Sequence, residues 1–121
     1  MKMTELLATY DAYDIVVVPF PFIDSASVKR RPAVVLSQAD NFNKLIDSSV
    51  LAMITTSTVM TWPLDVSIHD LNSAGLTHNC HIRMKIFTLD HRLILKKIGK
   101  LSVRDQKALS QSLKQLIHIK N

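Results

Sequence analysis

Hydrophobic residues recur along the chain in short runs with the spacing and composition of β-strands. Residues 15–18 and 33–36 are aliphatic and mostly β-branched, as in buried strands, and residues 50–55 form a third run. In residues 64–68 apolar and polar side chains alternate, which is typical of a half-exposed strand. The same alternation continues over residues 79–87, as one strand or a strand pair. The chain up to this point therefore predicts several short antiparallel strands.

The C-terminal part has a helical pattern. Residues 89–98 predict one helix that ends at Gly99. A second helix is expected to begin after Ser102, whose side chain caps it, with Asp105 three residues later. The apolar residues of this helix recur on one side, which is expected to face the core: Leu109, Leu113, Leu116 and Ile117. Strands followed by helices predict an α+β fold, a small antiparallel β-barrel packed by C-terminal helices.

The length of 121 residues suits one domain with one core. We interpret residues 13–121 as that domain and residues 1–12 as an N-terminal appendage, for which a short helix capped by Thr4 is one interpretation. The single cysteine, Cys80, excludes an intrachain disulfide. The chain has no apolar run long enough to cross a membrane and no signal-peptide pattern at its N-terminus. A cytoplasmic protein is therefore expected.

Positive charge is in excess, with a formal net charge of +5. Most cations of the second half lie between Arg83 and Arg104, where Asp90 is the one acidic residue. Such a bias favours a polyanionic partner.

A run of three cations, Lys29, Arg30 and Arg31, precedes the second predicted strand. Pro32 disfavours the helical backbone conformation for the residue before it, so Arg31 is held extended where it enters the strand. A guanidinium fixed there is a preorganised anion ligand, because it offers two parallel donors to phosphate oxygens. The alternative is an ordinary solvated basic turn.

A cluster of hydroxyl residues that includes Thr55, Thr56 and Ser57 ends the third predicted strand. Metal-free RNA cleavage needs little more than a cation and a hydroxyl, since the ribose 2′-OH is itself the nucleophile. For Thr55 alone, a hydroxyl that bonds a neighbouring strand is the simpler interpretation. The five histidines form no recognised ligand pattern, so no metal or cofactor is expected.

Several motifs together resemble the MazF/PemK toxins, the ribosome-independent mRNA interferases of bacterial toxin–antitoxin pairs. In chain order they are Asp14-Ile-Val-Val-Val-Pro-Phe-Pro, Arg30-Arg-Pro-Ala-Val-Val-Leu-Ser, Met53-Ile-Thr-Thr-Ser, Trp62-Pro-Leu-Asp-Val, Ala74-Gly-Leu, Leu89-Asp and Ile98-Gly-Lys-Leu. Openings in that family usually read Gly-Asp-Ile-Val, and here Tyr13 replaces the glycine. The resemblance covers residues 13–118 and rests on the ordered combination rather than on any single motif.

This resemblance implies the SH3-like barrel of the MazF/CcdB fold, usually as a homodimer. It also implies a metal-independent, sequence-specific endoribonuclease that cuts single-stranded mRNA and leaves 2′,3′-cyclic phosphate and 5′-OH ends. An acidic antitoxin protein is the implied partner. Arg31 and Thr55 match the Arg-Pro and Ile-Thr positions that supply the catalytic pair in several family members.

The other candidate RNA-binding residues are Lys29, Arg30, Thr56, Ser57, His81 and Arg83. The general base is left open. Some relatives carry an Asp soon after the arginine that Arg83 matches, and no Asp follows it here. Others carry an acid in the first loop, where Asp24 is the nearest one. The candidate bases are Asp24, His81 and His78.

Two other interpretations are kept. A catalytically weak or inactive nucleic-acid-binding barrel is one, because the expected carboxylate is missing. A CcdB-like gyrase poison of the same fold is the other, although such a toxin has no need of a phosphate site formed by Arg31 and Thr55.

Overall fold

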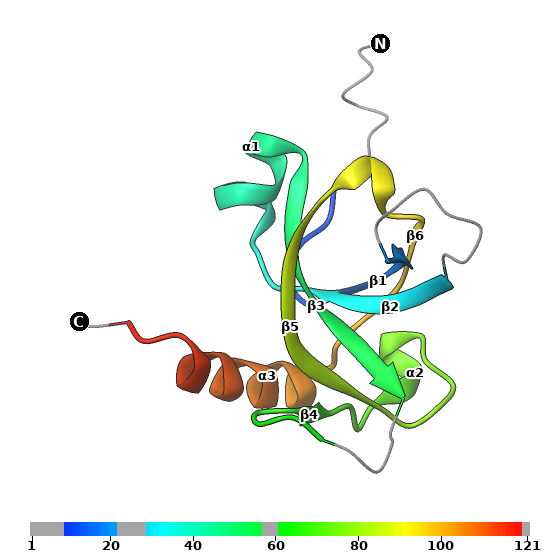
Figure 1. Ribbon diagram of the computed structural model, residues 1–121, viewed down its shortest axis with the longest axis vertical. Coiled ribbons are helices and arrows are strands. Elements are labelled where there is room, and N and C mark those ends of the chain that lie inside the picture. The colour runs from blue at the N-terminus through cyan, green and yellow to red at the C-terminus, as the bar shows by residue number, and fades with distance from the viewer. Residues whose placement is uncertain (1–8, 22–28, 57–60, 120–121) are drawn as a thin grey trace.

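The computed structural model describes residues 9–21, 29–56 and 61–119, and it shows a six-stranded antiparallel sheet that curls into a half-barrel (Figure 1). The strands are β1 (Asp14–Phe20), β2 (Lys29–Val35), β3 (Ser48–Thr56), β4 (Val66–Ser67), β5 (Cys80–Asp90) and β6 (Lys96–Lys100), in the sheet order β4-β5-β3-β2-β1-β6. The helices are η2 (Ala39–Asn43), α1 (Lys44–Ile46), α2 (Leu71–Ala74), η3 (His91–Leu93) and α3 (Val103–Leu116). The expected α+β barrel is confirmed. In the described ranges, no helix has the length and apolar character needed to cross a membrane.

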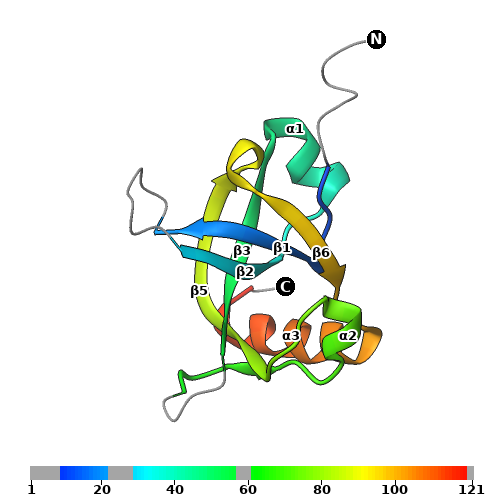
Figure 2. The same cartoon turned by 90° about the vertical axis from the view of Figure 1, so that its right-hand side faces the viewer.

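Alternation along the strands sends side chains to two faces of the sheet, and each face has its own core. On the face covered by α3 (Figure 2), Ile15 and Val34 pack in one cluster with Leu109. Val16 and Ala33, their neighbours in sequence, belong to the cluster on the other face. A shift of one residue in strand pairing would exchange the two sets of side chains, so the core fixes the register.

The helix predicted over residues 89–98 is wrong. β5 continues to Asp90, the short η3 follows, and β6 then pairs with β1 at the edge of the sheet. The Leu95 amide, just before β6, donates to the Val17 carbonyl at 2.9 Å. An aliphatic run with interspersed lysines suits either a short helix or an edge strand, and here the pairing with β1 decides between them.

Both glycines of the chain serve one contact, between α2 and β6. A Cβ atom on Gly75 would lie 2.1 Å from the carbonyl oxygen of Ile98, and one on Gly99 would lie 2.4 Å from the carbonyl carbon of Ala74. Gly75 also ends α2 with a left-handed φ of 74°. Gly99 therefore permits a close approach of two backbones. The prediction that Gly99 ends a helix is wrong.

The strand predicted over residues 64–68 is reduced to β4. Leu64 has a φ of 67°, which interrupts the extended backbone before that strand. In the resulting turn the Asp65 amide donates to the Trp62 carbonyl at 3.2 Å, and Asp65 Oδ2 accepts from the Trp62 amide at 2.8 Å. The turn directs the Asp65 side chain toward β5, which matters for the site described below.

The apolar stripe predicted for α3 lies only partly in the core. Leu109 is buried and Leu113 is half-buried, but Leu116 and Ile117 are 40% and 49% exposed. The end of α3 projects beyond the sheet (Figure 1), which leaves these last side chains at the surface. The expectation that all of the stripe faces the core is therefore wrong for its C-terminal half.

Tyr13 has a φ of 74°, a backbone conformation that glycine adopts without strain. This explains the glycine that precedes Asp-Ile-Val in the resembling toxins. Here the side chain is held instead, since the Tyr13 hydroxyl is hydrogen-bonded to Ser110 Oγ on α3 at 2.9 Å. The Tyr13 amide donates to Val35 O at 2.7 Å, and its carbonyl accepts from Leu101 N at 3.0 Å.

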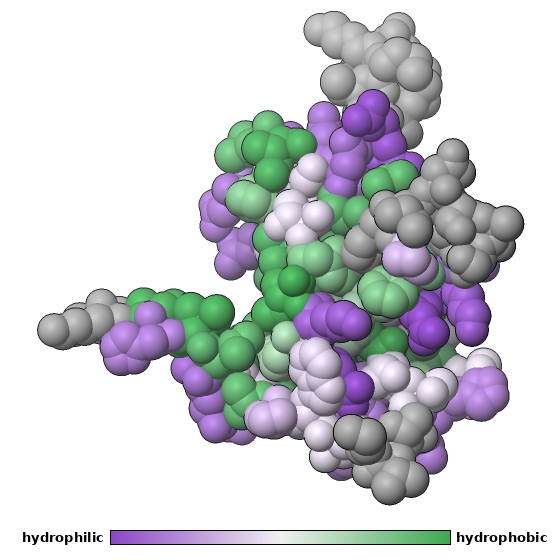
Figure 3. Space-filling view, viewed as in Figure 1, coloured by the Kyte–Doolittle hydropathy of each residue, from purple (hydrophilic) through white to green (hydrophobic). Residues whose placement is uncertain are grey.

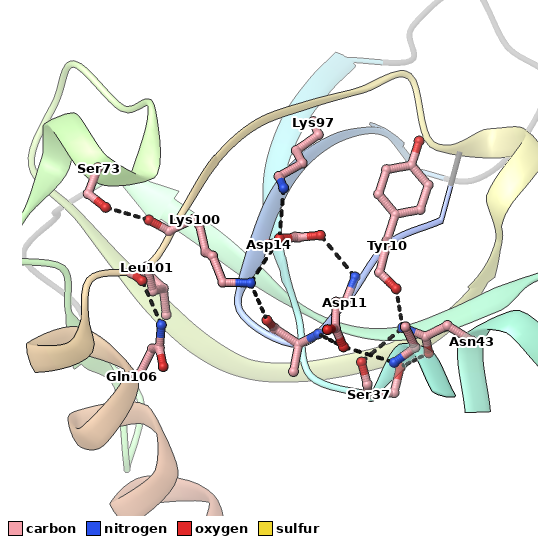
Figure 4. A network of polar contacts seen from close by, with 12 residues as sticks. Tyr10, Asp11, Asp14, Ser37, Asn43, Ser73, Lys97, Lys100, Leu101 and Gln106 are labelled. Atoms are coloured by element: carbon pink, nitrogen blue, oxygen red, sulfur yellow. Dashed lines mark hydrogen bonds and ion pairs between the residues drawn. The ribbon is translucent and has the colours of Figure 1, made fainter. Parts of the chain in front are cut away.

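Figure 4 shows the polar network that fixes the start of β1. The buried Asp14 carboxylate pairs with Lys97 at 3.1 Å and Lys100 at 3.4 Å, both on β6. Asn43 donates to the Tyr10 carbonyl at 2.8 Å, and the Tyr10 ring is buried in the core cluster of Val16. The part of the N-terminal segment from Tyr10 onward is thus joined to the barrel.

Asp105 ties the start of α3 to the segment after β4. Ser102 Oγ accepts a hydrogen bond from the Asp105 amide at 3.3 Å, so the predicted helix cap is confirmed. The Asp105 carboxylate is fully buried and accepts from the amides of His69 at 3.1 Å and Asp70 at 2.9 Å. Sequence spacing alone suggested only the cap.

We expect Asp105→Ala to lower the free energy of unfolding by about 3 kcal/mol, because it removes a buried acceptor from two backbone amide donors. Urea denaturation at fixed protein concentration measures this. The control is Asp40→Ala, which removes a carboxylate whose side chain is 85% exposed in its pair with Lys44 and should change stability by less than about 0.5 kcal/mol. Equal effects of the two substitutions would contradict the role given to Asp105.

Candidate active site

The register of β2 and β3 brings Arg31 and Thr55 together. Ala33 on β2 lies opposite Met53 on β3. Continuing that register along both strands places Arg31 opposite Thr55 on the same face of the sheet. Thr55 is in turn paired with His81 on β5. Three neighbouring strands therefore contribute to one row of side chains.

This row borders a pocket of about 220 Å³. Its lining residues are Phe20, Arg31, Met53, Ile54, Thr55, Trp62, Arg83 and Lys85. Among these described residues three carry a positive charge and none carries a carboxylate. The pocket is therefore suited to an anion.

Arg31 is half-buried in this pocket, with its guanidinium carbon 5.8 Å from the centre of the Phe20 ring. Its Nε is buried and has no hydrogen-bond partner among the described residues. A buried donor without a partner is costly, and a bound oxygen would satisfy it. Lys85 lies over the same ring, with Nζ 5.0 Å from its centre. Phe20 thus holds two cations at one side of the pocket.

A buried carboxylate, Asp65, holds the other side of the pocket. Arg83 donates to it through Nε at 3.4 Å and Nη2 at 3.2 Å. His81 Nε2 lies 3.2 Å from Asp65 Oδ2 and 3.1 Å from Arg83 Nη2. The Arg83 guanidinium carbon also lies 5.0 Å from the centre of the Trp62 ring. The Asp65 side chain is 8% exposed. This one carboxylate contacts Trp62, Arg83 and His81 and so fixes their positions beside the pocket.

Burial raises the pKa of the Asp65 carboxyl, but the hydrogen bonds from Arg83 and from the Trp62 amide outweigh it. The positive charge of Arg83 and the neighbouring His81 act in the same direction. The net result is a pKa below the ordinary value of 3.8. Asp65 is therefore an ionised structural acceptor near neutral pH rather than a proton carrier.

The sequence from residue 11 to residue 117 matches the family of PemK-like, MazF-like toxins of type II toxin–antitoxin systems. The chain belongs to this family. Its toxins are known as endoribonucleases. No curated protein sequence matches the chain significantly.

Solved structures of MazF toxins share the fold. A MazE–MazF complex from Deinococcus radiodurans is 18% identical, with a TM-score of 0.71 over 93% of this chain and 99% of that chain. MazF alone from the same organism is 20% identical, with a TM-score of 0.69 over 90% and 96% of the two chains. An endoribonuclease from a mycobacterial species, in complex with its cognate antitoxin, is 15% identical, with a TM-score of 0.68 over 88% and 91%.

The structure places the other candidate RNA contacts of this MazF-like chain at different depths. Lys29 and Arg30 are exposed at the start of β2, and Thr56 is exposed at the end of β3. Arg83 lines the pocket. Ser57 lies outside the described residues.

The candidate bases are not equally placed. His78 is exposed, is bonded to the Thr77 hydroxyl at 2.9 Å, and does not line the described pocket. His81 is buried behind Arg83, with its Nε2 engaged by Asp65 and Arg83. Asp24 lies outside the described residues. In the described part of the chain, no three His, Cys, Asp or Glu side chains converge as metal ligands.

Sequence reasoning missed the role of Asp65. A carboxylate does lie beside Arg83, but it comes from a turn 18 residues earlier and acts as a structural acceptor, so it does not replace the Asp sought soon after Arg83 as a base. Asp65 stands in the motif Trp62-Pro-Leu-Asp-Val, but strand alternation suggested only a half-exposed strand residue there. The positive φ of Leu64, which no pattern indicated, redirects that side chain.

The basic region from Arg83 to Arg104 is less cationic in the structure than in the sequence. Arg83 pairs with Asp65, Arg92 with Asp90, and Lys97 and Lys100 with Asp14. Arg83, which lines the pocket, is itself one of these paired cations, so the density of cations along the chain overstates the charge of this region.

The lowered pKa of Asp65 predicts how its contribution to stability depends on pH. The ionised carboxylate stabilises the fold above its unfolded-state pKa, and that contribution is lost as the pH falls through the lower folded-state pKa. Asp65→Asn should therefore be less stable than wild type at pH 6, and the difference should shrink as the pH falls below the ordinary value of 3.8 and through the lower pKa of the folded state. Urea denaturation across this range measures it, and a difference independent of pH would contradict the electrostatic role.

Proposed function

We propose that this chain is a metal-independent endoribonuclease that cuts single-stranded mRNA at specific sequences, as the toxin of a type II toxin–antitoxin pair. One observation carries the proposal: Arg31 and Thr55, from two neighbouring strands, line the same cationic pocket. The buried Nε of Arg31, which lacks a partner among the described residues, supports an anionic ligand there. A gyrase poison that acts by protein contact would not need this arrangement.

The proposed reaction is transesterification. The ribose 2′-oxygen attacks the adjacent phosphorus, a bond from phosphorus to that oxygen forms, and the bond from phosphorus to the 5′-oxygen breaks. The products are a 2′,3′-cyclic phosphate and a 5′-OH. Arg31 donates to the phosphate oxygens as negative charge develops on them, and the Thr55 hydroxyl adds another donor.

Proton transfer is the less defined part of this proposal. A general base must accept the proton of the 2′-OH, and a general acid must donate a proton to the leaving 5′-oxygen. Arginine is a poor base because its guanidinium stays protonated in proteins, so we assign Arg31 to charge stabilisation and to protonation of the leaving oxygen. Among the described residues His81 is the candidate base that lies nearest the pocket, although its Nε2 is engaged by Asp65 and Arg83.

Incubation of the purified protein with a defined single-stranded RNA in EDTA tests the proposal. We expect cuts at a recurring sequence, 5′-OH ends that polynucleotide kinase can label, and no cutting of the same RNA in a duplex, whose bases stay stacked. Cleavage that requires a divalent cation would contradict metal independence. No cut RNA together with binding to gyrase would favour the CcdB-like alternative instead.

The second part of the proposal is an acidic antitoxin as partner. The net charge of +5 and the cationic pocket favour an acidic segment by complementarity. Similar structures include a MazE–MazF complex and an endoribonuclease bound to its cognate antitoxin. A synthetic acidic peptide from an adjoining reading frame should inhibit cleavage, with an effect that weakens as salt increases.

The third part is a homodimer formed through the apolar surface at the end of α3. Ile86, Leu116, Ile117 and Ile119 are exposed, and Figure 3 shows apolar residues gathered along the outer part of this helix. A groove of about 300 Å³ lies here, and its lining is apolar except for Lys114. Exposed apolar patches of this kind mark protein interfaces.

Ile117→Asp should therefore convert a dimer to a monomer, because it places a charge in an apolar interface. Light scattering after size-exclusion chromatography measures the mass. The control is Val103→Asp at the other end of α3, where the side chain is 66% exposed and outside the groove, and it should leave the dimer intact. A monomeric wild-type protein at micromolar concentration would contradict this part of the proposal.

A further inference from the structure

Among the Phe, Tyr and Trp residues that the structure describes, Trp62 is the one with an exposed side chain. It is 43% exposed and lines the same pocket as Arg31 and Thr55. It is also the one tryptophan in the sequence. A partly exposed indole beside a cationic pocket contributes little to the core. It offers a flat apolar surface on which the flat face of a ligand can pack.

Two contacts hold this indole in place. The Arg83 guanidinium lies against one face of the ring, 5.0 Å from its centre. The Trp62 amide donates to Asp65 at 2.8 Å, and the same carboxylate binds Arg83 at 3.2 Å. Asp65 therefore fixes the backbone of one partner and the side chain of the other. A ring already fixed in this way loses little conformational freedom when a ligand binds.

We propose that Trp62 and Arg83 form a stacking site for one unpaired nucleobase of the RNA, next to the phosphate held by Arg31 and Thr55. The inference rests on the proposed function and adds a base-binding subsite to it. Every nucleobase has a π-face, so stacking on an aromatic ring tolerates any base. Trp62 thus contributes affinity for unpaired RNA, while the choice of sequence depends on other groups.

The first test uses the intrinsic fluorescence of Trp62. Single-stranded 2′-fluoro RNA, which lacks the attacking hydroxyl, is titrated into the wild-type protein, together with a series in which each position in turn is abasic. We expect the intact oligonucleotide to quench the fluorescence. One oligonucleotide of the abasic series should still bind but quench little. It keeps the phosphates that the protein holds and lacks the base that stacks on Trp62. Quenching that is the same for every abasic oligonucleotide would overturn the inference.

The second test measures binding of a labelled 2′-fluoro oligonucleotide by fluorescence anisotropy. Trp62→Ala should raise Kd by roughly 5- to 150-fold, the range for loss of one base–aromatic stack, and Trp62→Phe should recover part of this. The control is Leu45→Ala on α1, which removes another exposed apolar side chain, 73% exposed, near the opposite end of β3. A Trp62→Ala protein that binds RNA as tightly as wild type would overturn the inference.

Both tests use RNA that cannot be cut, so they are independent of the catalytic proposal. Binding with position-specific quenching, but no cleavage of ordinary RNA, would support the stacking site and overturn the nuclease. Cleavage of RNA without quenching would support the nuclease and overturn the stacking site. If Trp62 instead contacts only a protein partner, RNA binding will be unchanged in Trp62→Ala, and the inference is overturned.

Discussion

Arg31→Ala is expected to abolish cleavage of single-stranded RNA while the protein stays folded. In the proposed mechanism the guanidinium supplies two donors and a charge to the scissile phosphate, and loss of even one such donor costs about 100- to 1,000-fold in rate. We therefore expect a fall of more than about 1,000-fold, measured in single-turnover cleavage. The fold should persist, because the Arg31 side chain contacts the Phe20 ring at the pocket rather than the buried core.

Two matched variants sharpen this prediction. Arg30→Ala removes an exposed arginine that alternation sends to the opposite face of the same strand, so its effect on rate should be small. Arg31→Lys keeps the charge but cannot offer two coplanar donors, and should restore little activity. Circular dichroism and thermal unfolding establish that each variant is folded. A folded Arg31→Ala protein that cuts at the wild-type rate would remove Arg31 from the mechanism.

Thr55→Val should slow cleavage by roughly 30- to 1,000-fold, or about 2–4 kcal/mol, because one donor to the transition state is lost. Valine keeps the branched shape that suits β3, so the strand and its pairing with His81 should remain. The loss should appear in the single-turnover rate rather than in the Kd for uncut RNA. That division separates a transition-state contact from a contact that only binds RNA.

The adjacent hydroxyl provides the control. Thr56 is exposed and points to the other face of β3, outside the set of residues that line the pocket. Thr56→Val should therefore cut at close to the wild-type rate. If Thr56→Val were the damaging change and Thr55→Val were not, the functional face of β3 would be the opposite one.

The β-strands could be predicted because each has a local signal, either a short aliphatic, β-branched run or an alternation of apolar and polar side chains. Residues 15–18 and 50–55 lie inside observed strands, and the run 33–36 lies in β2 except for its last residue, because β2 ends at Val35. The helix predicted over 89–98 failed because the edge strand β6 depends on pairing with β1, at the other end of the chain. A local pattern carries no information about such a partner. Gly99 misled in the same way, since its backbone neighbour, Ala74, is distant in sequence.

The candidate site was predicted unevenly for the same reason. Arg31 and Thr55 came from motifs, and the register then places them opposite each other, while their catalytic roles remain a prediction. Asp65 and Trp62 were missed because the turn that presents them depends on the left-handed backbone of Leu64. The proline before Leu64 favours a β-turn, but the residue at the left-handed position of such a turn is usually glycine or asparagine, and leucine gave no sign of that conformation.

The register of β2 and β3 also bears on how such a site is inherited. Arg31 and Thr55 are aligned by the pairing of Ala33 with Met53, both buried on the same face of the sheet. Core residues of many identities can preserve this alternation, which rules out a one-residue slip between the two strands. Sequences can therefore drift far, as in the D. radiodurans relative of like fold at 18% identity, without losing the alignment of two strands. If the proposed mechanism holds, what must be kept beyond the register is small: one guanidinium, one hydroxyl and the turn that carries Asp65.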